Sequence, residues 1–164
     1  MRIKKITLVA VLVSIGLVLG ILEAKIPFMT IIPGGKIGLS NICVLLSVYL
    51  LTPAHSLLIS VLKGLLVSVL TGNISAFLYS GTGGAVSVLS MVLAKKALKE
   101  KTSCVGVSII GAMAFNLSQV IVFAIAVNNI NMLRYLPVLW FISAFSGLVT
   151  GIISNGILGV VKNV

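Results

Sequence analysis

The chain has 164 residues, of which 59% are hydrophobic and only 9% are charged, and its mean hydropathy is +1.27. Soluble domains are about 45–50% apolar and about 25% charged, so this composition excludes an ordinary soluble protein and indicates an integral membrane protein. The net charge of +10 comes from basic residues that lie between hydrophobic stretches, where a membrane explains them better than binding to nucleic acid.

Six apolar segments predict the helices. A helix that spans a membrane needs roughly 20 apolar residues, within a range of about 17–25. The first segment, from Ile6 to Leu22, is longer than the ~7–15-residue core of a signal peptide, and we expect it to be retained as a helix. The second segment is short, and either begins with a turn within IIPGGK or lies shallow in the membrane. The expected helices cover residues 6–22, 37–51, 54–71, 74–94, 103–127 and 136–161.

These helices are predicted to form one all-α domain over residues 1–164, a single bundle of six transmembrane helices. Three groups of basic residues then fall on one side of the bundle: near the N-terminus, between the fourth and fifth helices, and at the C-terminus. Their members are Arg2, Lys4, Lys5, Lys95, Lys96, Lys99, Lys101 and Lys162. Because Lys and Arg are enriched in cytoplasmic loops, we predict a multi-pass protein with both termini in the cytoplasm.

Lys63 lies in the middle of the third apolar segment, within LISVLKGLLVS. A charge at the centre of a bilayer costs about 2.5–3.5 kcal/mol on insertion scales, and such residues usually face the bundle interior or a wet cavity. At helical spacing Lys63 shares a face with Ser56 and Ser60. The predicted topology puts Glu23, its candidate carboxylate on the outer side, more than one helical turn further out. Two interpretations stay open: Lys63 extends towards the cytoplasmic surface, or it faces a cavity and attracts an anion.

Further polar residues are compatible with a pocket in the outer half of the bundle. Asn116 and Gln119 are three residues apart and share one helix face. Each of these side chains can instead make an interhelical hydrogen bond, as polar residues do between membrane helices. Taken together, they predict a substrate-binding pocket for an anion or a polar ring. The candidate residues are Lys36, Asn41, Lys63, Tyr79, Asn116, Gln119 and Arg134.

Pairs of small residues four positions apart occur in the first and last helices. Small residues let membrane helices approach closely. Such pairs predict packing within the bundle or, on one face of the first helix, docking of a partner membrane protein. The pairs are Ala10 with Ser14, Gly16 with Gly20, and Gly147 with Gly151.

Several kinds of catalytic chemistry have no residues to support them. The chain has only two acidic residues, far apart, whereas Mg²⁺ sites need clustered carboxylates, and it contains no P-loop. Its single histidine, His55, has no candidate triad partners, and Cys43 and Cys104 lack the spacing of metal ligands. Acids within the apolar segments that would relay protons are missing too. We therefore expect no catalytic residues, no metal and no cofactor, and predict a binding protein rather than an enzyme.

Four stretches carry a resemblance to a known family. They are PGGKIGLSNICVLL (33–46), SVLKGLLVSVLTGNISAFLYSGTGGAVSVLSM (60–91), GAMAFNLSQ (111–119) and YLPVLWFISAFSGLVTG (135–151). Over nearly the whole chain, the sequence resembles the bacterial Gx transporter family, also called heptaprenyl diphosphate synthase component I. Members of that family often have an arginine at the position of Lys63. They usually read His-Asn-Leu-Gly-Gln where residues 115–119 of this chain read FNLSQ.

That family is similar to the substrate-binding S-components of energy-coupling-factor (ECF) vitamin transporters. The resemblance implies a six-helix subunit in the bacterial cell membrane for uptake of a small anionic or ring-containing molecule, such as a vitamin, quinone or isoprenoid precursor. It implies that Ala10 and Ser14 dock onto a membrane scaffold subunit, and that separate ATPase subunits power the movement. The alternatives are an accessory membrane subunit of prenyl diphosphate or menaquinone biosynthesis, and a structural protein of a membrane redox complex.

Overall fold

The computed structural model describes residues 2–25, 38–98 and 103–162, and these residues form six α-helices and one short 3₁₀ helix. The elements are α1 (Arg2–Ala24), α2 (Asn41–Leu50), α3 (Pro53–Leu70), α4 (Ser75–Leu98), α5 (Cys104–Ala126), η3 (Ile130–Tyr135) and α6 (Leu136–Lys162). The all-helical class and the six predicted helices are confirmed, and each observed end lies within four residues of the predicted one.

The helix ends follow local sequence signals. α3 begins with Pro53, whose missing N–H and fixed φ suit the first turn of a helix. At the start of α5, the Ser103 hydroxyl accepts a hydrogen bond from the Gly106 N–H, as a helix-capping serine does. α3 and α5 end just before residues with positive φ, Gly72 (+72°) and Asn128 (+52°). Beyond both residues, backbone N–H groups bond back to carbonyls of the last turn, which is the Schellman ending of a helix.

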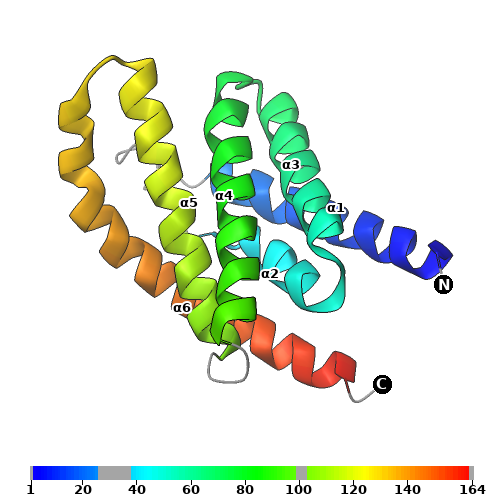
Figure 1. Ribbon diagram of the computed structural model, residues 1–164. Helices are drawn as coiled ribbons and strands as arrows, with labels where there is room; N and C mark the ends of the chain where they lie inside the picture. The colour runs from blue at the N-terminus through cyan, green and yellow to red at the C-terminus, as the bar shows by residue number, and fades with distance from the viewer. Residues whose placement is uncertain (1, 26–37, 99–102, 163–164) are drawn as a thin grey trace.

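Neighbouring helices alternate in direction along the chain (Figure 1). On α1, Gly16 and Gly20 lie against Lys63 and Val67, which are four residues apart on α3, so α1 and α3 run parallel. α2 begins beside the last turn of α1 and runs back along it. The remaining helices continue this alternation, so that α1, α3 and α5 run one way and α2, α4 and α6 the other. Both chain ends consequently lie towards the same end of the bundle.

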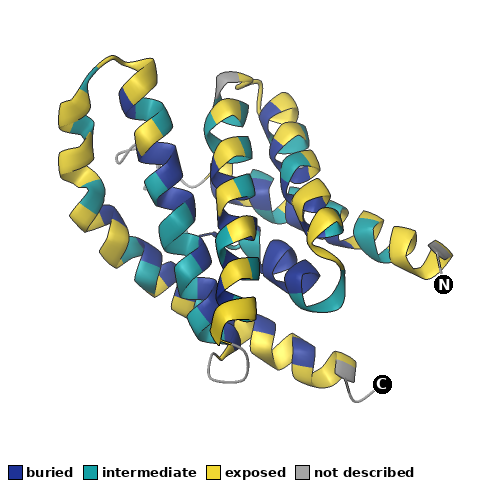
Figure 2. Cartoon of the chain, viewed as in Figure 1, coloured by how far each residue is buried: buried dark blue, intermediate teal, exposed yellow. Residues whose placement is uncertain are grey.

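α2 is shorter than the predicted second span. Its ten residues give a length of about 15 Å, half of the roughly 30 Å hydrocarbon core of a bilayer. The expectation of a transmembrane helix over residues 37–51 is therefore corrected to a half-length helix, with residue 37 outside the described part of the chain. α2 packs against α1, α3, α4 and α6, and all residues from Ile42 to Val48 are buried (Figure 2). A helix that is apolar all round is expected in such a central position.

Charged side chains from neighbouring helices lie at both ends of α2. At its C-terminal end, the Lys95 ammonium group of α4 donates to the Val48 carbonyl oxygen (2.9 Å) and lies 4.3 Å from the centroid of the Tyr49 ring. A cation at this position interacts favourably with the negative end of the helix dipole. At the N-terminal end, the Glu23 carboxylate of α1 accepts backbone hydrogen bonds. The short helix is thus held at both ends by the helices around it.

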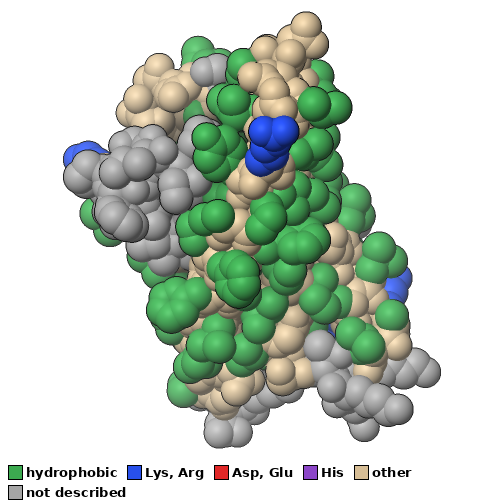
Figure 3. Space-filling model, turned by 90° about the vertical axis from the view of Figure 1, so that its left-hand side faces the viewer, with side chains coloured by type: hydrophobic (Ala, Val, Ile, Leu, Met, Phe, Trp, Pro, Cys, Tyr) green, Lys and Arg blue, Asp and Glu red, His purple; other side chains and the backbone are tan. Residues whose placement is uncertain are grey.

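The outer surface of the bundle is hydrophobic. Large apolar side chains are exposed on the outward faces, among them Ile125, Phe141 and Phe145, and Figure 3 shows hydrophobic side chains over the face that includes α6. Exposed apolar patches of this extent are rare on soluble proteins. Within the part of the chain that the structure describes, five segments are long and apolar enough to cross a membrane: Ile3–Ala24, Pro53–Leu70, Ala76–Leu98, Cys104–Ala126 and Ile130–Val161. These candidate spans indicate a multi-pass membrane protein.

The pairs of small residues divide between the inside and the outside of the bundle. The glycine pair of α1 packs against α3, and Gly147 and Gly151 of α6 pack against the backbone of α5. A Cβ atom on Gly147 would lie 2.6 Å from a Cα atom of α5, and one on Gly151 would lie 2.7 Å from another. By contrast, Ala10 and Ser14 are exposed on α1, and the Ser14 hydroxyl donates to the Ala10 carbonyl oxygen of its own helix (2.9 Å). The glycines therefore hold the bundle together, while the Ala10–Ser14 pair lies on its outer face.

Candidate functional site

Lys63 is buried inside the bundle, with 7% of its surface exposed. Its ammonium group donates hydrogen bonds to Asn41 Oδ1 (2.9 Å) and to Ser40 Oγ (3.2 Å), both at the start of α2. Gly16 of α1 leaves room for the lysine stem, because a Cβ atom there would lie only 3.0 Å from Lys63 Cδ. The polar face predicted for this helix is present, since Ser56 and Ser60 are buried as well. The charge therefore lies among polar groups of the protein rather than among lipid tails.

The side chains of Glu23 and Lys63 both form hydrogen bonds to the turn just before α2. The Glu23 carboxylate, 5% exposed, accepts hydrogen bonds from the backbone N–H groups of Leu39 (2.8 Å) and Ser40 (3.3 Å). Gly16 of α1 lies against Lys63 and Gly20 lies against Val67, so Glu23, seven residues after Gly16, lies about 10 Å further along the bundle, in line with the expected separation of more than one helical turn. The turn before α2 lies between the two side chains. Ser40 consequently bonds to both charges, through its N–H to Glu23 and through its hydroxyl to Lys63.

The three residues before α2 form a turn that brings these charges together. Gly38 has φ +76°, a value that glycine adopts without the steric cost of a side chain. A Cβ atom at Gly38 would also lie 3.0 Å from Ser146 Oγ of α6. The Gly38 carbonyl oxygen accepts a hydrogen bond from the Asn41 N–H (2.8 Å). The backbone of this turn thus depends on glycine both for its conformation and for its close contact with α6.

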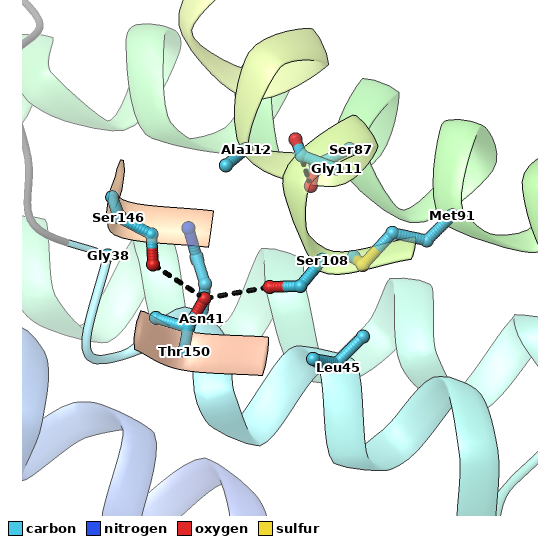
Figure 4. A pocket seen from close by; sticks show the side chains of 10 residues that line it. All are labelled: Gly38, Asn41, Leu45, Ser87, Met91, Ser108, Gly111, Ala112, Ser146 and Thr150. Carbon is cyan, nitrogen blue, oxygen red and sulfur yellow. Dashed lines mark hydrogen bonds between the residues drawn. The ribbon is translucent and has the colours of Figure 1, made fainter. Parts of the chain in front are cut away.

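A small cavity adjoins this cluster on the side of α4, α5 and α6 (Figure 4). Its volume is about 10 Å³, close to the space that one buried water needs. Hydroxyl groups line it: the Ser108 and Thr150 oxygens are 2.8 Å apart, and the Ser87 hydroxyl donates to the Gly111 carbonyl oxygen (2.8 Å). The lining residues are Gly38, Asn41, Leu45, Ser87, Met91, Ser108, Gly111, Ala112, Ser146 and Thr150. Asn41 therefore connects the two features, since it binds Lys63 and lines the cavity.

The remaining predicted site residues lie in different surroundings. Asn116 is buried and donates to the Ser143 hydroxyl of α6, which is the interhelical hydrogen bond that the sequence left open as an alternative. Tyr79 of α4 is half-buried and packs its ring against Phe123 of α5, with centroids 5.9 Å apart. Arg134 is exposed in η3. Gln119 is buried on α5. Lys36 lies outside the described residues.

Several polar residues of the site were missed in the sequence analysis. Ser40 and the hydroxyl groups of the cavity gave no signal, because single serines and threonines are common in membrane helices. Glu23 gave a clearer signal: it is one of only two acidic residues in the chain, and an acid beside an apolar segment is expected to have a polar partner.

Fold and site together define a helical, multi-pass membrane protein with opposite charges buried at the start of a half-length helix. A family model described as heptaprenyl diphosphate synthase component I matches residues 12–157, a range that includes Glu23, Ser40, Asn41 and Lys63. The chain belongs to this family. Comparison with curated proteins and with solved structures gave no match.

Proposed function

We propose that this protein is the substrate-binding subunit of an ECF-type uptake transporter in the bacterial cell membrane, and that it is not itself an enzyme. Its substrate is a small anionic or ring-containing molecule, such as a vitamin, a quinone precursor or an isoprenoid precursor. A separate membrane scaffold and ATPase subunits supply the energy for transport. The buried ammonium group of Lys63 carries this proposal.

The position of Lys63 favours an anionic substrate. A buried intramembrane charge is costly and marks a functional site more often than a structural one. The ammonium group lies at the start of α2, where helix N–H groups and the helix dipole also favour negative charge. Glu23 places a negative charge there through its hydrogen bonds to Leu39 and Ser40. An anionic substrate would approach the same end of α2.

Binding can be tested on the purified protein. A small molecule that stays with the protein in detergent would be identified by mass spectrometry after denaturation. Lys63→Met is expected to lower its retention at least tenfold, because the substrate loses its cationic partner. Lys96→Met, which removes an exposed lysine of α4, should leave retention unchanged. If the wild-type protein retains no small molecule from medium or cells, the binding role fails.

Partner docking gives a second, independent test. Ala10 and Ser14 lie exposed on α1, where small residues would let a scaffold helix approach closely. Ala10→Leu should leave folding unchanged and remove a membrane scaffold and its ATPases from the tagged protein purified in mild detergent. Val86→Leu, at an exposed position of α4, is the matched control and should keep them.

The name of the family favours one other function, an accessory subunit of prenyl diphosphate or menaquinone synthesis. With two acidic residues, the chain lacks the carboxylate cluster that would hold Mg²⁺ for a diphosphate substrate, so catalysis would reside in a partner. The same purification separates the two functions. Recovery of a soluble prenyl transferase whose activity depends on this chain, with no ATPase, would favour the accessory role.

A further inference from the structure

Gln119 is a buried amide without a hydrogen-bond partner among the described residues. Only 3% of its surface is exposed, and its Oε1 atom is buried and unpaired. More than nine in ten buried polar groups in proteins are hydrogen-bonded, and leaving one unpaired is costly, above all away from water. A glutamine in this situation therefore needs an explanation beyond packing.

The side chain of Gln119 faces the interior of the bundle. On α5, residues 108, 112 and 119 are spaced by four and seven positions and so lie on one helix face. Ser108 and Ala112 line the cavity that Asn41 also lines. Gln119 is seven residues beyond Ala112, about 10 Å along the helix axis. Its stem lies against Gly83 of α4, where a Cβ atom would be 3.1 Å from Gln119 Cγ.

The other unpaired buried atoms in the described chain are the hydroxyls of Ser80 and Ser154. A serine in a helix can rotate its hydroxyl onto the carbonyl four residues earlier, as Ser68 and Ser143 do here. The Gln119 Oε1 atom only accepts hydrogen bonds, so it cannot bond to a carbonyl of its own helix as a serine hydroxyl can. Gln119 thus differs from the two serines, because its buried Oε1 atom needs a donor from another group.

We propose that Gln119 recognises a hydrogen-bonding edge of the substrate. Its carbonyl oxygen accepts an N–H or O–H of the substrate, and its NH₂ group donates to a neighbouring substrate oxygen. The substrate therefore carries an amide-like edge that lies about 10 Å along α5 from the part near Ala112 and the cavity that Asn41 lines. This excludes prenyl diphosphates, whose hydrocarbon chains have neither donor nor acceptor. The inference rests on the proposed function, because it assigns a substrate class to that binding site.

The test combines binding with stability in the variants Gln119→Met and Ser154→Ala, each of which removes an unpaired polar group. Wild type and both variants, purified in detergent, are incubated with a small-molecule extract of bacterial cells to which farnesyl diphosphate is added. Retained compounds are measured by mass spectrometry, and thermal unfolding is followed without the extract. We expect both variants to unfold at the wild-type temperature or above it. Gln119→Met should retain at least tenfold less of a compound with an amide-like edge, and Ser154→Ala the wild-type amount.

The outcomes separate this inference from the proposed function. If wild type retains a compound and Gln119→Met retains it equally, or if the compound is farnesyl diphosphate, the role of Gln119 is overturned while the binding function stands. A clear fall in the unfolding temperature of Gln119→Met would also overturn it, since the amide would then have a structural partner. If wild type retains nothing, both the function and the inference fail.

Discussion

At the scale of single residues, Ser40 forms hydrogen bonds to two buried charged side chains, Glu23 and Lys63. Its N–H bonds to the Glu23 carboxylate and its hydroxyl to the Lys63 ammonium group. Removing one partner of a buried charged pair costs about 3–5 kcal/mol, because the other charge is left uncompensated. Replacing both charges is often far less harmful. Glu23 and Lys63 are therefore expected to be energetically coupled.

A double-mutant cycle measures this coupling. Glu23→Gln and Lys63→Met should each lower the unfolding temperature of the detergent-solubilised protein. The double variant should be more stable than the sum of the single effects predicts, by about 0.5–3 kcal/mol. Lys96→Met removes an exposed charge and should change stability little. Strictly additive effects of Glu23→Gln and Lys63→Met would show that the two charges act independently.

The residues of the site were predictable to different degrees. Lys63 stood out because one charge in an apolar segment breaks the pattern, and Ser56 and Ser60 share its helix face. The contact between Glu23 and Ser40 had no such signal, because it joins residues 17 positions apart that belong to different helices. The unpaired Oε1 atom of Gln119 depends on what neighbouring helices such as α4 offer, which no pattern within α5 contains.

At the scale of helices, α5 and α6 depend on glycine for their close contact. The backbone of α5 lies so near Gly147 and Gly151 that any side chain there would overlap with main-chain atoms. Main-chain atoms of a helix cannot move aside separately, so the two helices would have to shift apart. Hydrogen bonds such as that between Ser108 and Thr150 (2.8 Å) span the same contact and would be lost with it.

Glycine-to-alanine changes on α6 test this contact. Gly147→Ala should destabilise the protein by about 1–3 kcal/mol, the usual cost of overpacking, or more. Gly159→Ala is the matched control, because a Cβ atom there meets nothing within 4 Å. It should be neutral or slightly stabilising, since alanine favours a helix by roughly 0.5–1 kcal/mol over glycine. Thermal unfolding in one detergent compares them, and equal unfolding temperatures would contradict the close packing of α5 and α6.

Helix positions were more predictable than helix lengths across the membrane. Apolar segments alone located all six α-helices, because the hydrocarbon core demands long apolar stretches with satisfied backbone groups. The length of α2 could not be predicted in the same way, because nothing in its apolar segment indicates that the helix has only ten residues. That limit depends on the turn at Gly38 and on contacts with Glu23 and Lys95, which are brought there by other helices.

At the scale of the whole molecule, the alternation of six helices puts both chain ends at one end of the bundle. The distribution of Lys and Arg predicts that this end faces the cytoplasm. The connections between α3 and α4 and between α5 and α6 lie at the opposite end (Figure 1), and would then face the outside.

Cysteine labelling in intact cells tests this orientation. Asn128→Cys, at the connection after α5, should react with a membrane-impermeant maleimide from outside. Lys96→Cys, in the last turn of α4, should react only after the cells are permeabilised. Both positions are exposed, and the native Cys43 and Cys104 are buried, so the wild-type protein serves as the unlabelled control. The reverse pattern would invert the predicted topology.

The half-length of α2 has a consequence for how the protein enters the bilayer. A segment of about 15 Å that needs Glu23 at one end and Lys95 at the other is too short to be released into lipid on its own. During synthesis we expect this segment to stay at the translocon until α3 and α4 have emerged and can enclose it. Membrane integration of this region is therefore expected to proceed as one multi-helix step rather than helix by helix.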